Sequence, residues 1–140
     1  MTPGARIAAT IEILEKIEQP NTPNGQQISN YFRNRRYIGA QDRRAISDKV
    51  FNILRHHARL LWWTNNGIIR HRTIASLILL DGMTSQNVSD LFNGEGYAPS
   101  VLTELEQRMV NSLAGQNINH PSMPDALSNE VPDWLFKELK

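Results

Sequence analysis

Apolar residues recur through most of the chain at the three- and four-residue intervals that are typical of amphipathic helices. The first such segment follows Thr2 and Pro3, which predict a helix N-cap and the first helical position. Prolines, asparagines and a glycine in residues 19–25 predict the loop that ends this helix. No segment alternates polar and apolar residues as a β-strand does. The pattern therefore predicts an all-α fold, a compact bundle of about six to seven helices.

The third predicted helix is the longest. We expect it to run from Gln41 to Thr64 and to stop at the Asn65–Gly67 stretch. The next helix, over residues 70–81, is apolar on most faces and is closed by Gly82, which predicts a buried central helix. The remaining predictions are a helix over residues 26–36, a short one over 84–92 capped by Thr84 or Ser85, and one from a capping box at 103–106 to about Ala114.

Basic and acidic residues are segregated along the chain, although the net charge is only +1. Residues 33–72 hold ten basic and two acidic residues, a net charge of +8. Residues 73–140 hold three basic and nine acidic residues, a net charge of −6. Because local charge governs encounters with a polyanion, the basic segment is the place to look for a nucleic-acid surface.

The composition limits the classes of function. The chain has 140 residues, 40% of them hydrophobic, as expected for one globular domain over residues 1–140. It has no cysteine, which excludes disulfides, thiolate zinc sites and cysteine nucleophiles. The longest largely apolar run, IASLILL, is seven residues and includes one serine, so it is too short for a membrane span, and the first residues lack the pattern of a signal peptide. We expect a soluble, cytoplasmic protein.

The third predicted helix has an apolar side and a basic side. Arg43 and His57 project from the apolar side, and each has two interpretations. Arg43 either contacts phosphate or, as we favour, is satisfied locally by a carboxylate or by carbonyls at a helix end. For His57 we favour a neutral core histidine with one hydrogen-bond partner over a binding role.

The outward arginines are the candidate binding residues. A solvated face normally mixes both signs of charge, whereas this one barely does, so we expect it to bind an anion, namely a nucleic-acid backbone. Tyr37 is the best candidate for an exposed ring that stacks on a base. The alternative is the solvated back of an ordinary helical domain. The candidate nucleic-acid-binding residues are Arg33, Arg35, Arg36, Tyr37, Arg44, Arg55, Arg59, Arg70 and Arg72.

Signatures of catalysis are missing from the sequence. There is no glycine-rich phosphate loop, the histidines lack the spacing of metal ligands, and no serine belongs to a recognisable nucleophile constellation. We therefore expect no catalytic residues, no metal site and no cofactor site in this chain.

Four segments together resemble the N-terminal domain of bacterial RsmB/Sun (Fmu)-type methyltransferases, which methylate cytosine C5 in ribosomal RNA. The segments are MTPGARIAATIEILEKI, YFRNRRYIGAQDRRAISDKVFNILRHHARLLWW, LFNGEGYAPSVLTELEQ and VPDWLFKEL. They carry the family's G-x-x-D-R, V-x-x-x-L-R and P-x-W-L motifs. The matching residues are Gly39, Asp42 and Arg43, then Val50, Leu54 and Arg55, then Pro132, Trp134 and Leu135.

The resemblance implies a NusB-like helical fold and a non-catalytic role in binding or positioning ribosomal RNA. It also implies that the chain is the N-terminal fragment of a longer enzyme, whose own catalytic domain is a partner and holds the S-adenosylmethionine. Two alternatives stay open. One is a protein-interaction module, which the acidic C-terminal half and the apolar residues 134–136 favour. The other is a free-standing NusB-like antitermination or assembly factor.

Overall fold

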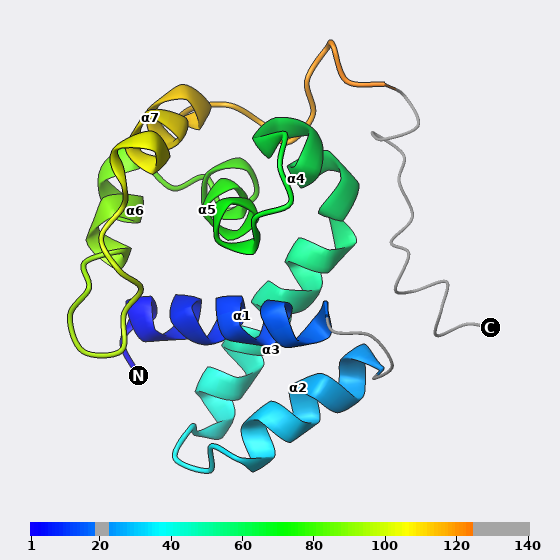
Figure 1. Ribbon diagram of the computed structural model, residues 1–140, viewed down its shortest axis with the longest axis vertical. Coiled ribbons are helices and arrows are strands. Elements are labelled where there is room, and N and C mark those ends of the chain that lie inside the picture. Colours follow the sequence, from blue (N-terminus) through cyan, green and yellow to red (C-terminus); the bar gives the residue numbers. More distant parts are fainter. Residues whose placement is uncertain (19–22, 125–140) are drawn as a thin grey trace.

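The computed structural model describes residues 1–18 and 23–124, which contain helices and no strand. An all-α bundle is therefore confirmed. Figure 1 shows α5 near the centre, with the other helices arranged around it. The helices are α1 (Pro3–Ile17), α2 (Asn24–Arg33), α3 (Ala40–Arg55), α4 (His57–Thr64), α5 (Ile69–Leu79), α6 (Ser85–Leu91) and α7 (Glu104–Leu113).

Helix α1 begins as its sequence predicts. The hydroxyl oxygen of Thr2 accepts a hydrogen bond from the backbone N–H of Ala5 at 3.1 Å, and Pro3 occupies the first turn. The apolar stripe of α1 packs against α2, α3 and α5. Gly4 allows a close approach at the start of this helix, because a Cβ there would lie 2.8 Å from the carbonyl oxygen of Leu91.

Helix α5 is the buried central helix that the sequence predicts. All of its residues from Arg72 to Leu79 are buried, and Ile74 and Leu77 have no exposed surface. Each such side chain contributes about 1.5–3 kcal/mol by burial. Gly82 closes the segment with φ at +70°, where the left-handed conformation favours glycine. Its N–H donates to the carbonyl oxygen of Ile78 at 3.1 Å.

One prediction about the helices is wrong. Residues 41–64 form two helices, α3 and α4, because the backbone leaves the helical conformation at His56, with φ at −109° and ψ at 21°. Nδ1 of His56 lies 2.8 Å from the carbonyl oxygen of Asn52, which also accepts the backbone N–H of His56 at 3.3 Å. The side chain thus shares the acceptor of the helical hydrogen bond at the break. The predicted stop is confirmed, since Asn65 is left-handed with φ at 54°.

The predicted N-caps of α6 and α7 are confirmed. The hydroxyl of Thr84 accepts the N–H of Asn87 at 3.1 Å and caps α6. At α7 the hydroxyl of Thr103 accepts the N–H of Glu106, while the carboxylate of Glu106 accepts the N–H of Thr103. Helix α2 begins and ends a few residues earlier than predicted. The expected helical pieces of the C-terminal tail lie outside the described residues.

Candidate nucleic-acid interface

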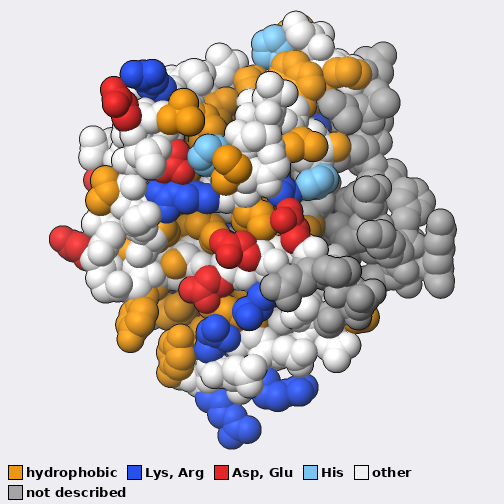
Figure 2. All heavy atoms as spheres, in the orientation of Figure 1, with side chains coloured by type: hydrophobic (Ala, Val, Ile, Leu, Met, Phe, Trp, Pro, Cys, Tyr) orange, Lys and Arg blue, Asp and Glu red, His pale blue; other side chains and the backbone are white. Residues whose placement is uncertain are grey.

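Three exposed arginines lie where α2 turns into α3. We call Arg33, Arg36, Arg43 and Arg44 the arginine corner. Arg33, Arg36 and Arg44 are exposed, and their side chains bond to none of the described residues. Figure 2 shows blue side chains gathered at the lower end of the face, where α2 lies in Figure 1. Nearer the middle of that face, acidic and basic side chains alternate.

The short turn between α2 and α3 fixes the direction of its side chains. Ile38 is buried in the core, with 1% of its surface exposed, and so anchors the turn. The neighbouring Tyr37 points outward and is 73% exposed. Backbone hydrogen bonds from Arg35 to Phe32 (3.0 Å) and from Ile38 to Arg35 (3.1 Å) hold the turn. The prediction that the ring of Tyr37 is exposed is therefore confirmed.

Arg43 is satisfied locally, as we favoured from the sequence. Its Nε donates to the carbonyl oxygen of Ile38 at 2.7 Å, and its guanidinium carbon lies 5.6 Å from the centre of the Phe32 ring. The residue is half-buried. Arg43 nevertheless lines a surface hollow together with Arg33 and Arg36. A ligand in that hollow could therefore reach Arg43 although its Nε is already bonded.

Arg35 has internal partners. Its Nη2 lies 3.7 Å from the carboxylate of Glu12, and its guanidinium carbon lies 3.8 Å from the centre of the Tyr31 ring. The Tyr31 hydroxyl donates to the same carboxylate at 3.1 Å. Burial and the nearby charge of Glu12 raise the pKa of Tyr31 well above its ordinary value. Arg35 is therefore less available than its neighbours to an external anion.

The expectation that Arg70 joins the exposed basic surface is wrong. Its Nε and Nη2 donate to the carboxylate of Glu106 at 2.8 and 3.0 Å. Its remaining donors bond to Ser100 and to the carbonyl oxygen of Val101. This arginine joins the start of α7 to the start of α5, and its charge is balanced by the carboxylate of Glu106, so it does not add to the exposed basic surface.

The same expectation is wrong for Arg72, which is only 6% exposed. Its Nη2 donates to the carboxylate of Glu18 at 2.6 Å and to the carbonyl oxygen of Gly67 at 3.0 Å. Its Nη1 donates to Nδ1 of His57 at 2.8 Å. His57 thus has the expected hydrogen-bond partner, but it lies on the surface and not in the core. The prediction assumed one continuous helix through residue 56, which would turn His57 towards the core. Because the helix breaks at His56, His57 faces the surface.

Arg55 and Arg59 lie apart from the arginine corner. Arg55 is exposed at the far end of α3, about 16 Å along the helix from Arg44 at the usual helical rise. Arg59, on α4, is half-buried and donates to the side-chain oxygen of Asn119 at 3.1 Å. Of the arginines predicted to form one patch, Arg33, Arg36 and Arg44 lie near one another, whereas Arg55 and Arg59 lie elsewhere, at the end of α3 and on α4.

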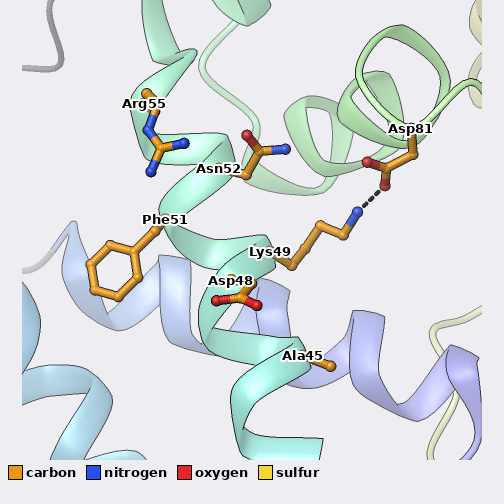
Figure 3. A pocket seen from close by; sticks show the side chains of 7 residues that line it. All are labelled: Ala45, Asp48, Lys49, Phe51, Asn52, Arg55 and Asp81. Atoms are coloured by element: carbon orange, nitrogen blue, oxygen red, sulfur yellow. Dashed lines mark hydrogen bonds and ion pairs between the residues drawn. The ribbon is translucent and has the colours of Figure 1, made fainter.

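A groove of about 590 Å³ runs along the outer side of α3, beside the end of α5. Figure 3 shows Asp48, Asn52 and Arg55 along the helix, and Lys49 reaching across to Asp81. Lys49 and Asp81 form an ion pair. Burial lowers the pKa of Lys49 below its ordinary value. The groove carries both signs of charge, so it lacks the one-sided charge of a phosphate-binding surface.

No protein-family model, no curated protein and no solved structure matches this chain. Among residues 1–18 and 23–124, no three histidines, aspartates or glutamates come together as metal ligands would. Within the same part of the chain, no helix has both the length and the apolar character needed to cross a membrane.

Sequence reasoning missed one residue of the interface. Ser29 lines the hollow together with Phe32 and Arg33 on one side of α2. The spacing of three and four residues places these side chains on one helix face, and that signal was present in the sequence. Arg43 reaches the same hollow from α3, which no local pattern could indicate.

Proposed function

We propose that this chain is a non-catalytic RNA-binding domain that positions ribosomal RNA for an S-adenosylmethionine-dependent cytosine-C5 methyltransferase. The observation that carries the proposal is the arginine corner, where Arg33, Arg36 and Arg44 are exposed and have no acidic partner among the described residues. Unpaired guanidinium groups on one surface attract a polyanion and pair readily with phosphate oxygens.

The neighbouring Tyr37 supports RNA in particular. RNA-binding proteins often recognise unpaired nucleotides by stacking bases on exposed aromatic rings. Tyr37 is 73% exposed and lies in the turn between Arg36 and the start of α3. Contacts from these arginines would give affinity and orientation, while sequence choice would come from elsewhere. The methyltransferase context rests on the resemblance of the sequence motifs, Gly39–Arg43 above all.

The test is a titration of a fluorescent single-stranded fragment of ribosomal RNA at several salt concentrations. We expect the logarithm of the binding constant to fall steeply with the logarithm of salt. Replacing Arg33, Arg36 and Arg44 together by alanine should weaken binding and make this slope shallower by about 2, since each phosphate contact contributes about 0.7 for a single strand. Circular dichroism would check that the variant stays folded.

Arg108→Ala is the matched control for one lost charge. Arg108 lies on α7, far from α2 in Figure 1, and its side chain is 73% exposed, with Glu104 as its partner. Its replacement should leave the binding constant and the slope nearly unchanged. The proposal would be contradicted by a binding constant that does not change with salt, or by one that is the same for the triple variant and the wild type.

A second candidate function, docking of another protein, is favoured by exposed apolar side chains near the starts of α5 and α7. Ile68, Val101 and Leu105 are 50%, 65% and 65% exposed, and Tyr97 in the preceding loop is 85% exposed. Exposed apolar side chains gathered in this way are typical of interaction surfaces. The apolar residues 134–136, which first favoured this alternative, lie outside the described residues.

A further inference from the structure

The arginine corner surrounds a hollow. It measures about 570 Å³ and is lined by Ser29, Phe32, Arg33, Arg36 and Arg43. Three arginines and a serine thus line one space, which they reach from α2, from the turn after it and from the first turns of α3. Phe32 forms an apolar wall, with 7% of its surface exposed.

Arg43 is held in place before any ligand arrives. Its Nε is bonded to the carbonyl oxygen of Ile38 at 2.7 Å, and Phe32 lies against its guanidinium group. The bond to Ile38 uses one of the five donors of the guanidinium and leaves its two NH₂ groups for another acceptor. Because the side chain is already ordered, binding an anion costs less conformational entropy here than at a mobile surface arginine.

The acidic residue closest to the hollow in sequence is occupied elsewhere. Asp42 precedes Arg43, but its carboxylate accepts from Arg6 at 2.7 Å and lies 3.5 Å from the N-terminal amine. The hydrogen bond from Arg6 holds the pKa of Asp42 below its ordinary value, so the group stays ionised and paired. Like charges that converge without a counter-ion repel one another, and an anion in the hollow would relieve that repulsion.

We infer that the hollow lined by Ser29, Arg33, Arg36 and Arg43 binds the terminal 5′-phosphate of an RNA strand. A phosphomonoester carries a charge of about −1.5 to −2 at neutral pH and offers three acceptor oxygens. Those oxygens match three guanidinium groups and a hydroxyl, whereas an internal phosphodiester carries a single charge. Tyr37 then lies beside the end of the strand, where its ring can stack on the first base.

This inference rests on the proposed function, since the ligand is an RNA end. The experiment compares two oligonucleotides of the same sequence that carry a 3′ fluorophore and differ only in a 5′-phosphate or a 5′-hydroxyl. We expect the phosphorylated strand to bind about tenfold more tightly at neutral pH, the size of one charge-assisted interaction. The preference should shrink towards pH 5, because the second phosphate proton binds with a pKa of about 6.

Two exposed arginines supply a matched pair of variants. Arg33→Gln removes a charge from the hollow, so it should reduce the preference for the phosphorylated strand. Arg44→Gln removes the same charge next to the hollow but outside its lining, so it should weaken both strands equally and keep the preference. Arg43→Lys keeps the charge, but an ammonium cannot bond to Ile38 and also present a fork, so the preference should again fall.

The outcomes separate the two ideas. Equal affinity for both strands, with a steep dependence on salt, overturns the inference and leaves RNA binding in place. A preference that Arg33→Gln leaves unchanged also overturns it. If neither strand binds, the inference and the proposed function are both contradicted. Adenosine monophosphate that competes as well as the oligonucleotide shows a site for free nucleotides, which overturns the assignment to an RNA end.

Discussion

Replacing Glu106 by glutamine should strongly destabilise the fold. Glu106 is 3% exposed and joins the starts of α5 and α7. One carboxylate oxygen accepts from Arg70 Nη2 at 3.0 Å and from the N–H of Thr103 at 2.9 Å. The other accepts from Arg70 Nε at 2.8 Å and lies 3.2 Å from Nε2 of His71. Asn66 donates to Nδ1 of the same ring, which places the ring proton on Nε2, facing Glu106.

The size of the effect follows from these four contacts. Glutamine keeps one acceptor oxygen, so either orientation of its amide turns an NH₂ group towards two donors. In one orientation these are Arg70 Nη2 and the N–H of Thr103, and in the other they are Arg70 Nε and His71. The charge of the half-buried Arg70 also loses its counter-ion. A charged hydrogen bond contributes about 1.5–3 kcal/mol, and removing one partner of a buried pair costs about 3–5 kcal/mol. Since Arg70 keeps its bonds to residues 100 and 101, we expect a loss of about 3 kcal/mol.

Urea and thermal unfolding at neutral pH, followed by circular dichroism, would measure this loss. For a domain of this size, 3 kcal/mol corresponds to a decrease in Tm of roughly 10 °C. Glu104→Gln is the control, since Glu104 is also in the first turn of α7 but its side chain is 86% exposed. That change removes a similar interaction with the helix dipole and should leave stability close to that of the wild type. A loss below about 1 kcal/mol for the buried residue would refute the reasoning.

The pH dependence gives a second readout of the same contacts. Burial opposes the charged form of Glu106, but the hydrogen bonds and charge of Arg70 and the N–H of Thr103 outweigh it and lower the pKa below 4.5. An acidic group whose pKa is lowered by folding stabilises the fold fully at a pH above its pKa in the unfolded chain. That contribution is lost as the pH falls through its pKa in the folded protein. The difference between wild type and Glu106→Gln should therefore be largest at neutral pH and shrink below pH 4.5.

Two further predictions concern packing and a buried charge. Gly4→Ala should cost about 1–3 kcal/mol in urea unfolding, because the new Cβ would lie 2.8 Å from the carbonyl oxygen of Leu91. The control is Gly25→Ala, whose new Cβ has no atom within 4 Å, so this change should be neutral or slightly stabilising. If both variants lose the same free energy of unfolding, the close contact at Gly4 is contradicted. Arg72→Ala should cost about 2–3 kcal/mol by removing the bond to Glu18. In conditions where this variant is folded, it should bind RNA like the wild type, and a weaker affinity would contradict its structural role.

Local signals were sufficient to predict most of the helices. Thr2, Thr84 and Thr103 each accept an N–H of the helix that they were expected to cap. Helix α5 was predicted to be central because polar residues are scarce in it, and it is buried in the structure. Caps and apolar faces act within one or two turns, so the sequence displays them directly.

The break at His56 could not be predicted from the same signals. No proline or glycine marks the site, and the apolar stripe continues through Ile53 and Leu60 on either side of it. The break depends on how the end of α3 and the start of α4 pack on their separate neighbours. Helical periodicity carries no information about that packing. The wrong position predicted for His57 follows from this one error.

The partners of the arginines explain why the count of charges overstated the binding surface. Residues 33–72 are strongly basic, but the acids that neutralise several of them come from other parts of the chain. Arg35 pairs with Glu12 and Arg72 pairs with Glu18. Lys49 pairs with Asp81 and Arg70 pairs with Glu106. Part of the charge that is segregated along the sequence is thus paired in space. No such acid reaches Arg33, Arg36 or Arg44 among the described residues, and Arg43 bonds to a neutral carbonyl. What distinguishes the arginine corner is that several arginines without an acidic partner lie near one another, so its field extends into solvent, where a phosphate can respond to it.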